Sequence, residues 1–97
     1  MAMYVSLIKF TDQGIHNIKD TVERHEASMA EAEKMGMKII QPLWTMGAYD
    51  VVVLLEAPDD ETMTAFALKV SSMGSVKTQT MRAFRSDEME DILAKIK

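Results

Sequence analysis

Apolar residues follow two different periods along this chain, and the changes of period divide it into strands and helices. Residues 3–10 (MYVSLIKF) are rich in branched and aromatic types and end at a turn-forming segment around Gly14, which predicts a strand. From residue 18 to residue 35 apolar positions recur every three or four residues, which predicts an amphipathic helix that ends at Gly36. The predicted buried stripe of this helix is Ile18, Val22, His25, Met29 and Ala32.

Two more strands are predicted in the middle of the chain. Residues 37–45 (MKIIQPLWT) form the first, and Pro42 places it at an edge or a bulge, because proline cannot donate a ladder hydrogen bond. After a short turn at residues 46–48, residues 50–56 predict a strand that is apolar on both faces. A strand of this kind has to be covered by two layers, so helices on one side are not enough.

A second helix and a fourth strand follow. Residues 58–60 (PDD) open the helix with a fixed dihedral angle and a capping carboxylate, and Gly74 stops it. Its predicted buried stripe is Met63, Phe66, Ala67, Val70 and Met73. Residues 76–84 (VKTQTMRAF) predict the fourth strand.

The C-terminal segment predicts a short last helix, which Ser86 and Asp87 can cap. Its apolar side is predicted to hold Met89, Ile92, Leu93 and Ile96. The order βαββαβα predicts an α+β fold, a ferredoxin-like βαββαβ plait with an extra C-terminal helix and a four-stranded antiparallel sheet. With no linker or low-complexity run, residues 1–97 are expected to form a single domain.

Composition and charge exclude several classes of protein. The net charge of −4 and the scattered basic residues argue against nucleic-acid binding. No apolar run approaches the ~20 residues that a membrane span needs, and the N-terminus lacks the pattern of a signal peptide. The chain has no cysteine, which fits a cytoplasmic protein. We expect no cofactor and no metal, since His16 and Asp20 could share an ion only with a third ligand that the sequence does not identify.

Three segments of the chain resemble the GYD-domain family, which is named for a Gly-x-Tyr-Asp segment. They are YVSLIKFTDQGIHNIKD (4–20), WTMGAYDVVVLLEAPDD (44–60) and TQTMRAF (78–84). The resemblance covers nearly the whole chain and implies a dimeric α+β barrel, in which two plaits place their sheets face to face. It also implies that the motif residues are Tyr4, Lys9, Thr11, Trp44, Gly47, Tyr49 and Asp50, while His16 and His25 lie outside the motif.

A ligand site is expected between the facing sheets and their loops, in a concave and mostly apolar space. From the period of two, we predict that Tyr4, Ser6, Ile8 and Phe10 face this space with Thr78, Thr80, Arg82 and Phe84. Val5, Leu7, Met81 and Ala83 are predicted to face the helices instead. The candidate ligand-binding residues are Tyr4, Ser6, Trp44, Tyr49, Asp50, Thr78, Thr80 and Arg82.

Structural roles compete with functional ones at most of these positions. Tyr49 and Asp50 are the candidate catalytic pair, but Asp50 can instead accept hydrogen bonds from the backbone of the turn or of a neighbouring strand. Gly47 is expected to supply a positive φ in this turn. Trp44 can wall a pocket or anchor a subunit interface. Arg82 can be a solvated charge or pair with a ligand carboxylate. His25, inside a helical stripe, is predicted to be a core or subunit-edge histidine that faces away from the pocket.

Three functions remain open at this point. The first is a homodimeric or larger oligomeric module that binds a small organic ligand or stabilises a complex. The second is a cofactor-independent oxygenase or isomerase of the dimeric α+β barrel type, with Tyr49 and Asp50 polarising and deprotonating the substrate. The third is an effector-binding regulatory subunit that acts through a partner. The first is preferred, because no acid, base or metal constellation stands out in the sequence.

Overall fold

The computed structural model describes residues 1–96, and these follow the predicted order of strands and helices with one short helix added. The elements are β1 (Ala2–Phe10), α1 (Asp12–His16), a 3₁₀ turn (Ile18–Asp20), α2 (Thr21–Lys34), β2 (Lys38–Trp44), β3 (Val51–Ala57), α3 (Asp60–Ser72), β4 (Val76–Ala83) and α4 (Ser86–Leu93). The added helix α1 stands where the sequence predicts only a turn. Thr11 caps it, since its side-chain oxygen accepts a hydrogen bond from the backbone N–H of Gly14.

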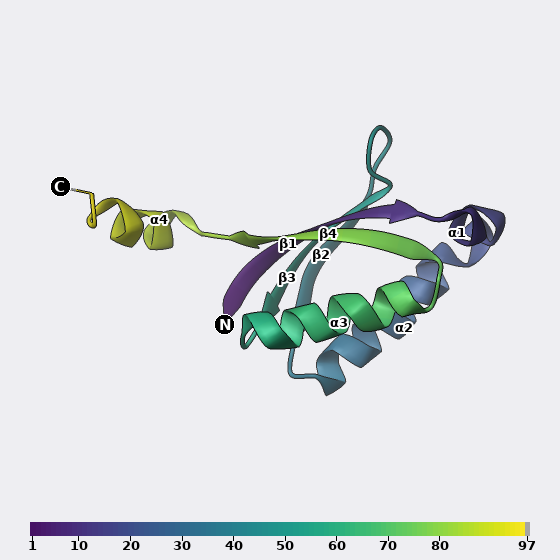
Figure 1. The fold of residues 1–97 in the computed structure, drawn as a ribbon, viewed down its shortest axis with the longest axis horizontal. Coiled ribbons are helices and arrows are strands. Elements are labelled where there is room, and N and C mark those ends of the chain that lie inside the picture. Colours follow the sequence, from purple (N-terminus) through teal and green to yellow (C-terminus); the bar gives the residue numbers. More distant parts are fainter. Residues whose placement is uncertain (97) are drawn as a thin grey trace.

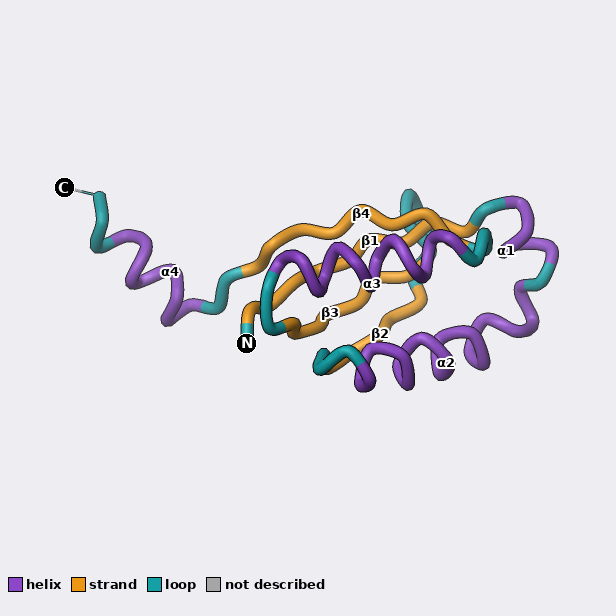
Figure 2. Tube along the Cα trace, turned by 60° about the horizontal axis from the view of Figure 1, so that its bottom comes forward, coloured by secondary structure: helices purple, strands orange, loops and turns teal. Residues whose placement is uncertain are grey.

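The four strands form one antiparallel sheet in the order β2-β3-β1-β4. Helices α2 and α3 lie on the same face of this sheet, as Figure 1 and Figure 2 show from two directions. Helix α2 packs against β2, and α3 packs against β3 and β4. This is the ferredoxin-like arrangement that the element order predicts, and the predicted fold is confirmed. The sheet face turned away from α2 and α3 is called the open face below.

The prediction of which strand residues face the helices is wrong. The residues beneath the helices are Tyr4, Ser6, Ile8 and Phe10 on β1 and Thr78, Thr80 and Arg82 on β4. Val5 and Leu7 lie on the open face instead, in register with Met81 and Gln79 of β4, and Ala83 belongs to the same set. Alternation sorts a strand into two sets of residues, but it does not say which set meets the helices when both contain polar and apolar types.

The core lies between β3, β1 and the two helices. Strand β3 alternates fully: Val51, Val53, Leu55 and Ala57 are buried, and Val52, Leu54 and Glu56 on the open face are half-buried. Helix α3 adds Met63 and Phe66, as its stripe predicts. The predicted stripe of α2 is only partly right. Ala32 is buried, but Val22 is 53% exposed and Ile18 lies outside the helix, in the 3₁₀ turn.

Local chain features that the sequence predicts are present in the sheet. Strand β2 is an edge strand, and its register with β3 shifts between Ile39 and Gln41, close to Pro42. The turn between β2 and β3 stands clear of the sheet on the side opposite the helices (Figure 1). Gly47 in this turn has a φ of 119°, a conformation that L side chains rarely adopt.

Close backbone packing fixes α1 to the start of β4. A Cβ atom on Gly14 would lie 2.1 Å from the carbonyl oxygen of Ser75, so only glycine fits there. The backbone N–H of Thr11 also donates to Ser75 O at 3.0 Å. The chain therefore enters α2 from a position set by β4, far along the sequence.

Helix α4 lies apart from the rest of the structure, beyond the end of β4 (Figure 1 and Figure 2). Arg85 links it back to the sheet through an ion pair with Glu56 at 3.1 Å. Met89 and Leu93 are 39% and 54% exposed, so the predicted apolar side of this helix is not covered within residues 1–96. In that part of the chain, no helix has the length and apolar character needed to cross a membrane.

Candidate functional site

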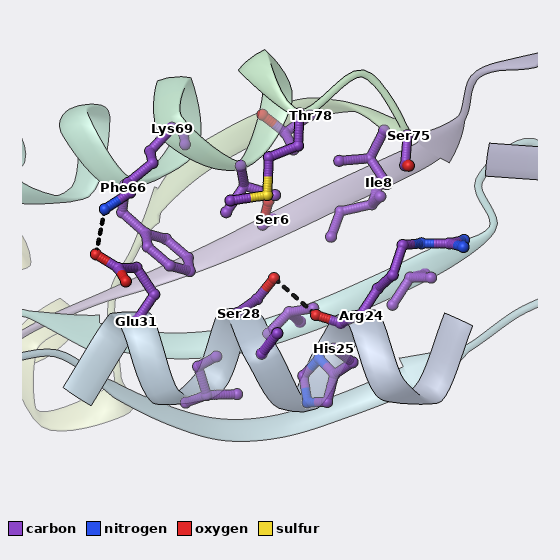
Figure 3. Close-up of a pocket in the computed structure, with 18 of the residues that line it drawn as sticks. Ser6, Ile8, Arg24, His25, Ser28, Glu31, Phe66, Lys69, Ser75 and Thr78 are labelled. Carbon is purple, nitrogen blue, oxygen red and sulfur yellow. Dashed lines mark hydrogen bonds and ion pairs between the residues drawn. The ribbon is translucent and has the colours of Figure 1, made fainter. Parts of the chain in front are cut away.

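A pocket of about 350 Å³ lies between α2, α3 and the helix-covered face of the sheet. Figure 3 shows it from the side, with α2 on one wall and α3 on the opposite wall. This volume falls within the range of small-molecule sites in proteins. The site expected from the sequence lies between facing sheets, whereas this pocket lies on the other side of the sheet.

Short side chains at the centre of the pocket create the space. Ser6 on β1, Ser28 on α2 and Thr78 on β4 line it, and Ser6 is the polar residue buried in the core. A close-packed core would place branched or aromatic side chains at such positions. The surrounding walls are apolar and include Ile8, Phe10, Ile39, Val51, Val53, Leu55, Met63, Phe66, Ala67 and Val70.

Two of the hydroxyl groups that line the pocket already have partners in the protein. Ser6 Oγ lies 3.2 Å from Thr80 Oγ1, and Ser28 Oγ donates to the carbonyl oxygen of Arg24 at 3.0 Å. Both groups therefore remain compatible with an apolar neighbour, because neither depends on a ligand for its hydrogen bond. The centre of the pocket favours an apolar molecule.

An ion pair between Glu31 of α2 and Lys69 of α3 closes one end of the pocket (Figure 3). The hydrogen bond from Lys69 is the main cause that lowers the pKa of Glu31 below its usual value. Both side chains are partly exposed to solvent, so the net contribution of the pair to stability is small. The ion pair connects α2 to α3 across the pocket.

Arg24 of α2 lies at the opposite end (Figure 3). Its guanidinium group donates to the carbonyl oxygens of Asn17 at 2.6 Å and Gly14 at 3.3 Å, and its Cζ atom lies 6.0 Å from the centre of the Phe10 ring. No carboxylate within residues 1–96 forms an ion pair with it. At one end of the pocket the charges of Glu31 and Lys69 compensate each other, and at the other end the positive charge of Arg24 is uncompensated.

His25 and Trp44 form an edge-to-face pair between α2 and β2. Their ring centroids are 5.6 Å apart with an interplanar angle of 77°, and the Trp44 indole N–H donates to Thr21 Oγ1 at 3.1 Å. His25 Nε2 is buried and has no hydrogen-bond partner among the described residues. Burial lowers the pKa of His25 below its ordinary value, so the neutral ring is favoured. The ring contributes to the wall of this pocket, which is not the inter-sheet site that the sequence predicts it to face away from.

The candidate ligand-binding residues do not form one site. Ser6, Trp44 and Thr78 line the pocket described above. Tyr4, Thr80 and Arg82 line a second, more open hollow between α3 and β4, which Thr78 also borders. Tyr49 and Asp50 belong to neither. Trp44 and Tyr49 therefore do not wall a common pocket, because the β2–β3 turn sends them to opposite sides of the sheet.

The second hollow is organised by a hydrogen bond from the Tyr4 hydroxyl to the carboxylate of Asp60. Burial, and then this hydrogen bond, raise the pKa of Tyr4 to about 12. Arg82 lies over the rings of Tyr4 and Phe84, with its Cζ atom 5.6 Å and 4.7 Å from their centres. It also lies 3.8 Å from Glu88 of α4. Arg82 is thus a bridge to α4, and the proposed pairing with a ligand carboxylate stays a prediction.

On the open side, the polar ends of Tyr49 and Asp50 point to different partners. The Tyr49 hydroxyl donates to Gln79 Oε1 at 3.0 Å, and Lys9 Nζ lies 5.6 Å from the centre of its ring. Asp50 accepts from the backbone N–H of Phe10 at 2.8 Å. The prediction that Asp50 accepts a backbone hydrogen bond from a neighbouring strand is confirmed, whereas the idea that it orients Tyr49 is wrong.

Sequence reasoning missed Arg24, which is the one described residue that brings an unpaired charge to the pocket wall. The available signal was its spacing of four from Ser28, which places both residues on one helix face. The predicted buried stripe of this helix includes neither residue. Within residues 1–96, no group of three or more His, Asp or Glu side chains is placed to hold a metal ion.

Comparison with known proteins identifies the family. The sequence model of the GYD domain matches residues 4–93, which is almost the whole chain and confirms the resemblance. The chain belongs to the GYD-domain family. In these terms Asp50, the aspartate of the Gly-x-Tyr-Asp segment, holds the end of β1, and the tyrosine lies over the open face.

Two similar proteins from Thermus thermophilus extend the comparison. A protein named "Glutamine synthetase and cystathionine beta-lyase binding protein" is 31% identical over 98 residues, covering 100% of both chains. The crystal structure of TTHA0845 from the same species superimposes with a TM-score of 0.57 at 22% identity, covering 89% of this chain and 96% of that one. The second similarity supports the fold.

Proposed function

We propose that this GYD-domain protein is an oligomeric binding module that works by holding other proteins, beginning with a second copy of itself. The observation that carries the proposal is the apolar character of the open face. Its apolar residues come from all four strands and are Leu43, Val52, Leu54, Val5, Leu7 and Met81. Leu43 and Met81 are 50% and 43% exposed, and no helix within residues 1–96 lies over them.

A second copy of this chain fits the open face because the apolar face of one copy can pack against the same apolar face of the other. Sheets that bury one face under helices commonly bury the other against another sheet, which gives a layered core. A two-fold axis would place the same apolar set on both sides of the interface. Tyr49, Lys9 and Gln79 would then form a polar border at one end.

Helix α4 supports the same proposal. It extends past the end of the sheet and carries the exposed apolar residues Met89 and Leu93, which a monomer leaves in water. A partner subunit stacked on the open face supplies a surface for this side of the helix. The acidic first turn of α4, with Asp87 and Glu88, leaves the opposite side polar.

A role in holding an enzyme is supported by the relative named as a glutamine synthetase and cystathionine beta-lyase binding protein. We extend this kind of role to the present chain: the oligomer binds a metabolic enzyme as a protein partner. The oxygenase or isomerase hypothesis needs Tyr49 and Asp50 to act together, and their separate hydrogen-bond partners do not favour it.

Self-association is tested by sedimentation of the wild type and of Leu54→Asp and Met81→Lys at micromolar concentration. Both changes place a charge on the open face, which we expect to convert a dimer, or a multiple of it, into a folded monomer. Leu68→Asp is the matched control, because Leu68 is 66% exposed on the outer side of α3. A wild-type monomer with an intact sheet by circular dichroism would contradict the proposal.

Enzyme binding is tested by biolayer interferometry with the immobilised protein. The analytes are the glutamine synthetase and the cystathionine β-lyase of the organism that encodes this chain. Saturable binding of at least one of them, reduced in Leu54→Asp and retained in Leu68→Asp, is the expected result. No binding of either enzyme to an oligomeric wild type would remove the enzyme-holding role and leave self-association standing.

A further inference from the structure

We propose that the pocket between α2, α3 and the sheet binds a small apolar molecule that carries one carboxylate, and that Arg24 pairs with this carboxylate. The pocket belongs to each single chain and lies on the opposite side of the sheet from the open face. The inference therefore stands apart from the protein-binding function, and each can fail without the other.

The charge pattern of the pocket selects an anion. Arg24 lines the pocket, is half-buried, and forms no ion pair with a carboxylate in the described part of the chain. Its contacts with the carbonyl oxygens of Asn17 and Gly14 hold the guanidinium group in place without neutralising it. A preoriented guanidinium with free donors is well suited to a carboxylate, which it can bind through two parallel hydrogen bonds.

The other cationic side chain of the pocket, Lys69, already has an acidic partner. Lys69 pairs with Glu31 at the far end, so the two charges there compensate each other. The pocket consequently offers a single place for an anionic group, and a ligand with a carboxylate at each end would meet Glu31. This arrangement favours a monocarboxylate over a dicarboxylate.

The walls select the rest of the ligand. Between Arg24 and the Glu31–Lys69 pair the lining is made of aliphatic and aromatic side chains, among them Ile8, Phe66 and Val70. The hydroxyls of Ser6 and Ser28 have hydrogen-bond partners within the protein, so they do not require a polar group on the ligand. A volume of about 350 Å³ accommodates a hydrocarbon chain or ring system of moderate size rather than a long-chain lipid.

The test uses decanoate as the probe and 1-decanol as its uncharged counterpart, with binding measured by the fluorescence of Trp44 and by calorimetry. Trp44 is the only tryptophan and lines the pocket, so its emission reports occupancy directly. We expect saturable binding of decanoate and binding of decanol weaker by about 10- to 100-fold, as for loss of a charge-assisted hydrogen bond. No saturable binding of decanoate would overturn the proposal.

Arg24→Met should remove the preference for decanoate, whereas Arg24→Lys should keep a preference because it keeps the charge. Lys34→Met is the matched control, since it removes one positive charge from the exposed side of the same helix. An unchanged preference in Arg24→Met, or an equal loss in Lys34→Met, would show that general electrostatics and not Arg24 selects the ligand.

Filling the pocket gives a test that does not touch the charge. Ser28→Met projects a longer side chain from α2 into the space, and methionine adapts well to irregular gaps. The variant should fold, melt at or above the wild-type temperature, and bind decanoate at least about tenfold more weakly. If this folded variant binds as the wild type does, the ligand sits elsewhere and the assignment of the pocket is wrong.

Discussion

The backbone N–H of Phe10 donates a 2.8 Å hydrogen bond to Oδ2 of Asp50, across 40 positions of sequence. The backbone N–H of Asp50 in turn donates to the carbonyl oxygen of Ile8 at 2.8 Å. These two bonds extend the β1–β3 ladder by one further step, where the regular pairing of the strands ends. The aspartate of the family motif therefore holds the end of β1, and the turn that carries Tyr49 ends at this anchor.

Asp50→Asn is expected to destabilise the protein by about 1–2 kcal/mol, because an amide oxygen is a weaker acceptor than a carboxylate for the Phe10 N–H. Urea unfolding at fixed protein concentration measures the change. Asp91→Asn is the matched control on the exposed side of α4 and should change the free energy of unfolding by less than about 0.5 kcal/mol. Equal effects of the two changes would refute an anchoring role.

Tyr49→Phe and Gln79→Leu should show a coupling of about 0.5–1 kcal/mol in a double-mutant cycle, because the Tyr49 hydroxyl donates to Gln79 Oε1 at 3.0 Å. The ring itself stays over Lys9 in Tyr49→Phe, so the fold and the oligomeric state should be retained. Additive effects of the two substitutions would mean that the hydrogen bond makes no net contribution in solution.

Tyr4 should titrate about two units above an ordinary tyrosine, since burial and the bond to Asp60 raise its pKa to about 12. Absorbance at 295 nm in a Tyr49→Phe background isolates this group, because the chain has two tyrosines. The folded state holds the proton more tightly than the unfolded state. The stabilising contribution is therefore complete below about pH 10 and is lost as the pH rises through about 12.

Asp60→Asn should lower the pKa of Tyr4, because it removes both the negative charge and the strong acceptor beside the hydroxyl. Burial alone would then keep the value above that of an exposed tyrosine. A titration near pH 10 in the wild type would contradict the buried position of the hydroxyl.

Protonation of His25 should quench the fluorescence of Trp44 with a midpoint below pH 6.5, since burial lowers the pKa of this histidine and the two rings are 5.6 Å apart. The unfolded chain takes up the proton before the folded one, so the associated stability is lost as the pH falls below 6.5. His25→Phe should abolish the transition, and His16→Gln, in α1, should leave it in place. A midpoint at or above 6.5 would place the ring in solvent.

Local features of the fold could be read from the sequence because they depend on neighbouring residues only. The change from alternation to a helical period separates β1 from α2, and the proline of β2 restricts that strand to an edge. The run of branched residues in β3 predicts that both faces of this strand are covered. In the structure one set of its side chains is buried beneath the helices and the other set, on the open face, is half-buried. Gly47 supplies the positive φ that its turn requires.

Only the tertiary structure decided which residues share a site, because this depends on where separate elements meet. The set containing Tyr4 and Ser6 and the set containing Val5 and Leu7 are similarly mixed, so alternation left open which of them α2 and α3 cover. Trp44 and Tyr49 flank one short turn, yet the path of that turn sends them to opposite faces of the sheet. The contact between Gly14 and Ser75 fixes where the chain enters α2, and Arg24 reaches the pocket from there, so its position follows from packing between distant segments of the chain.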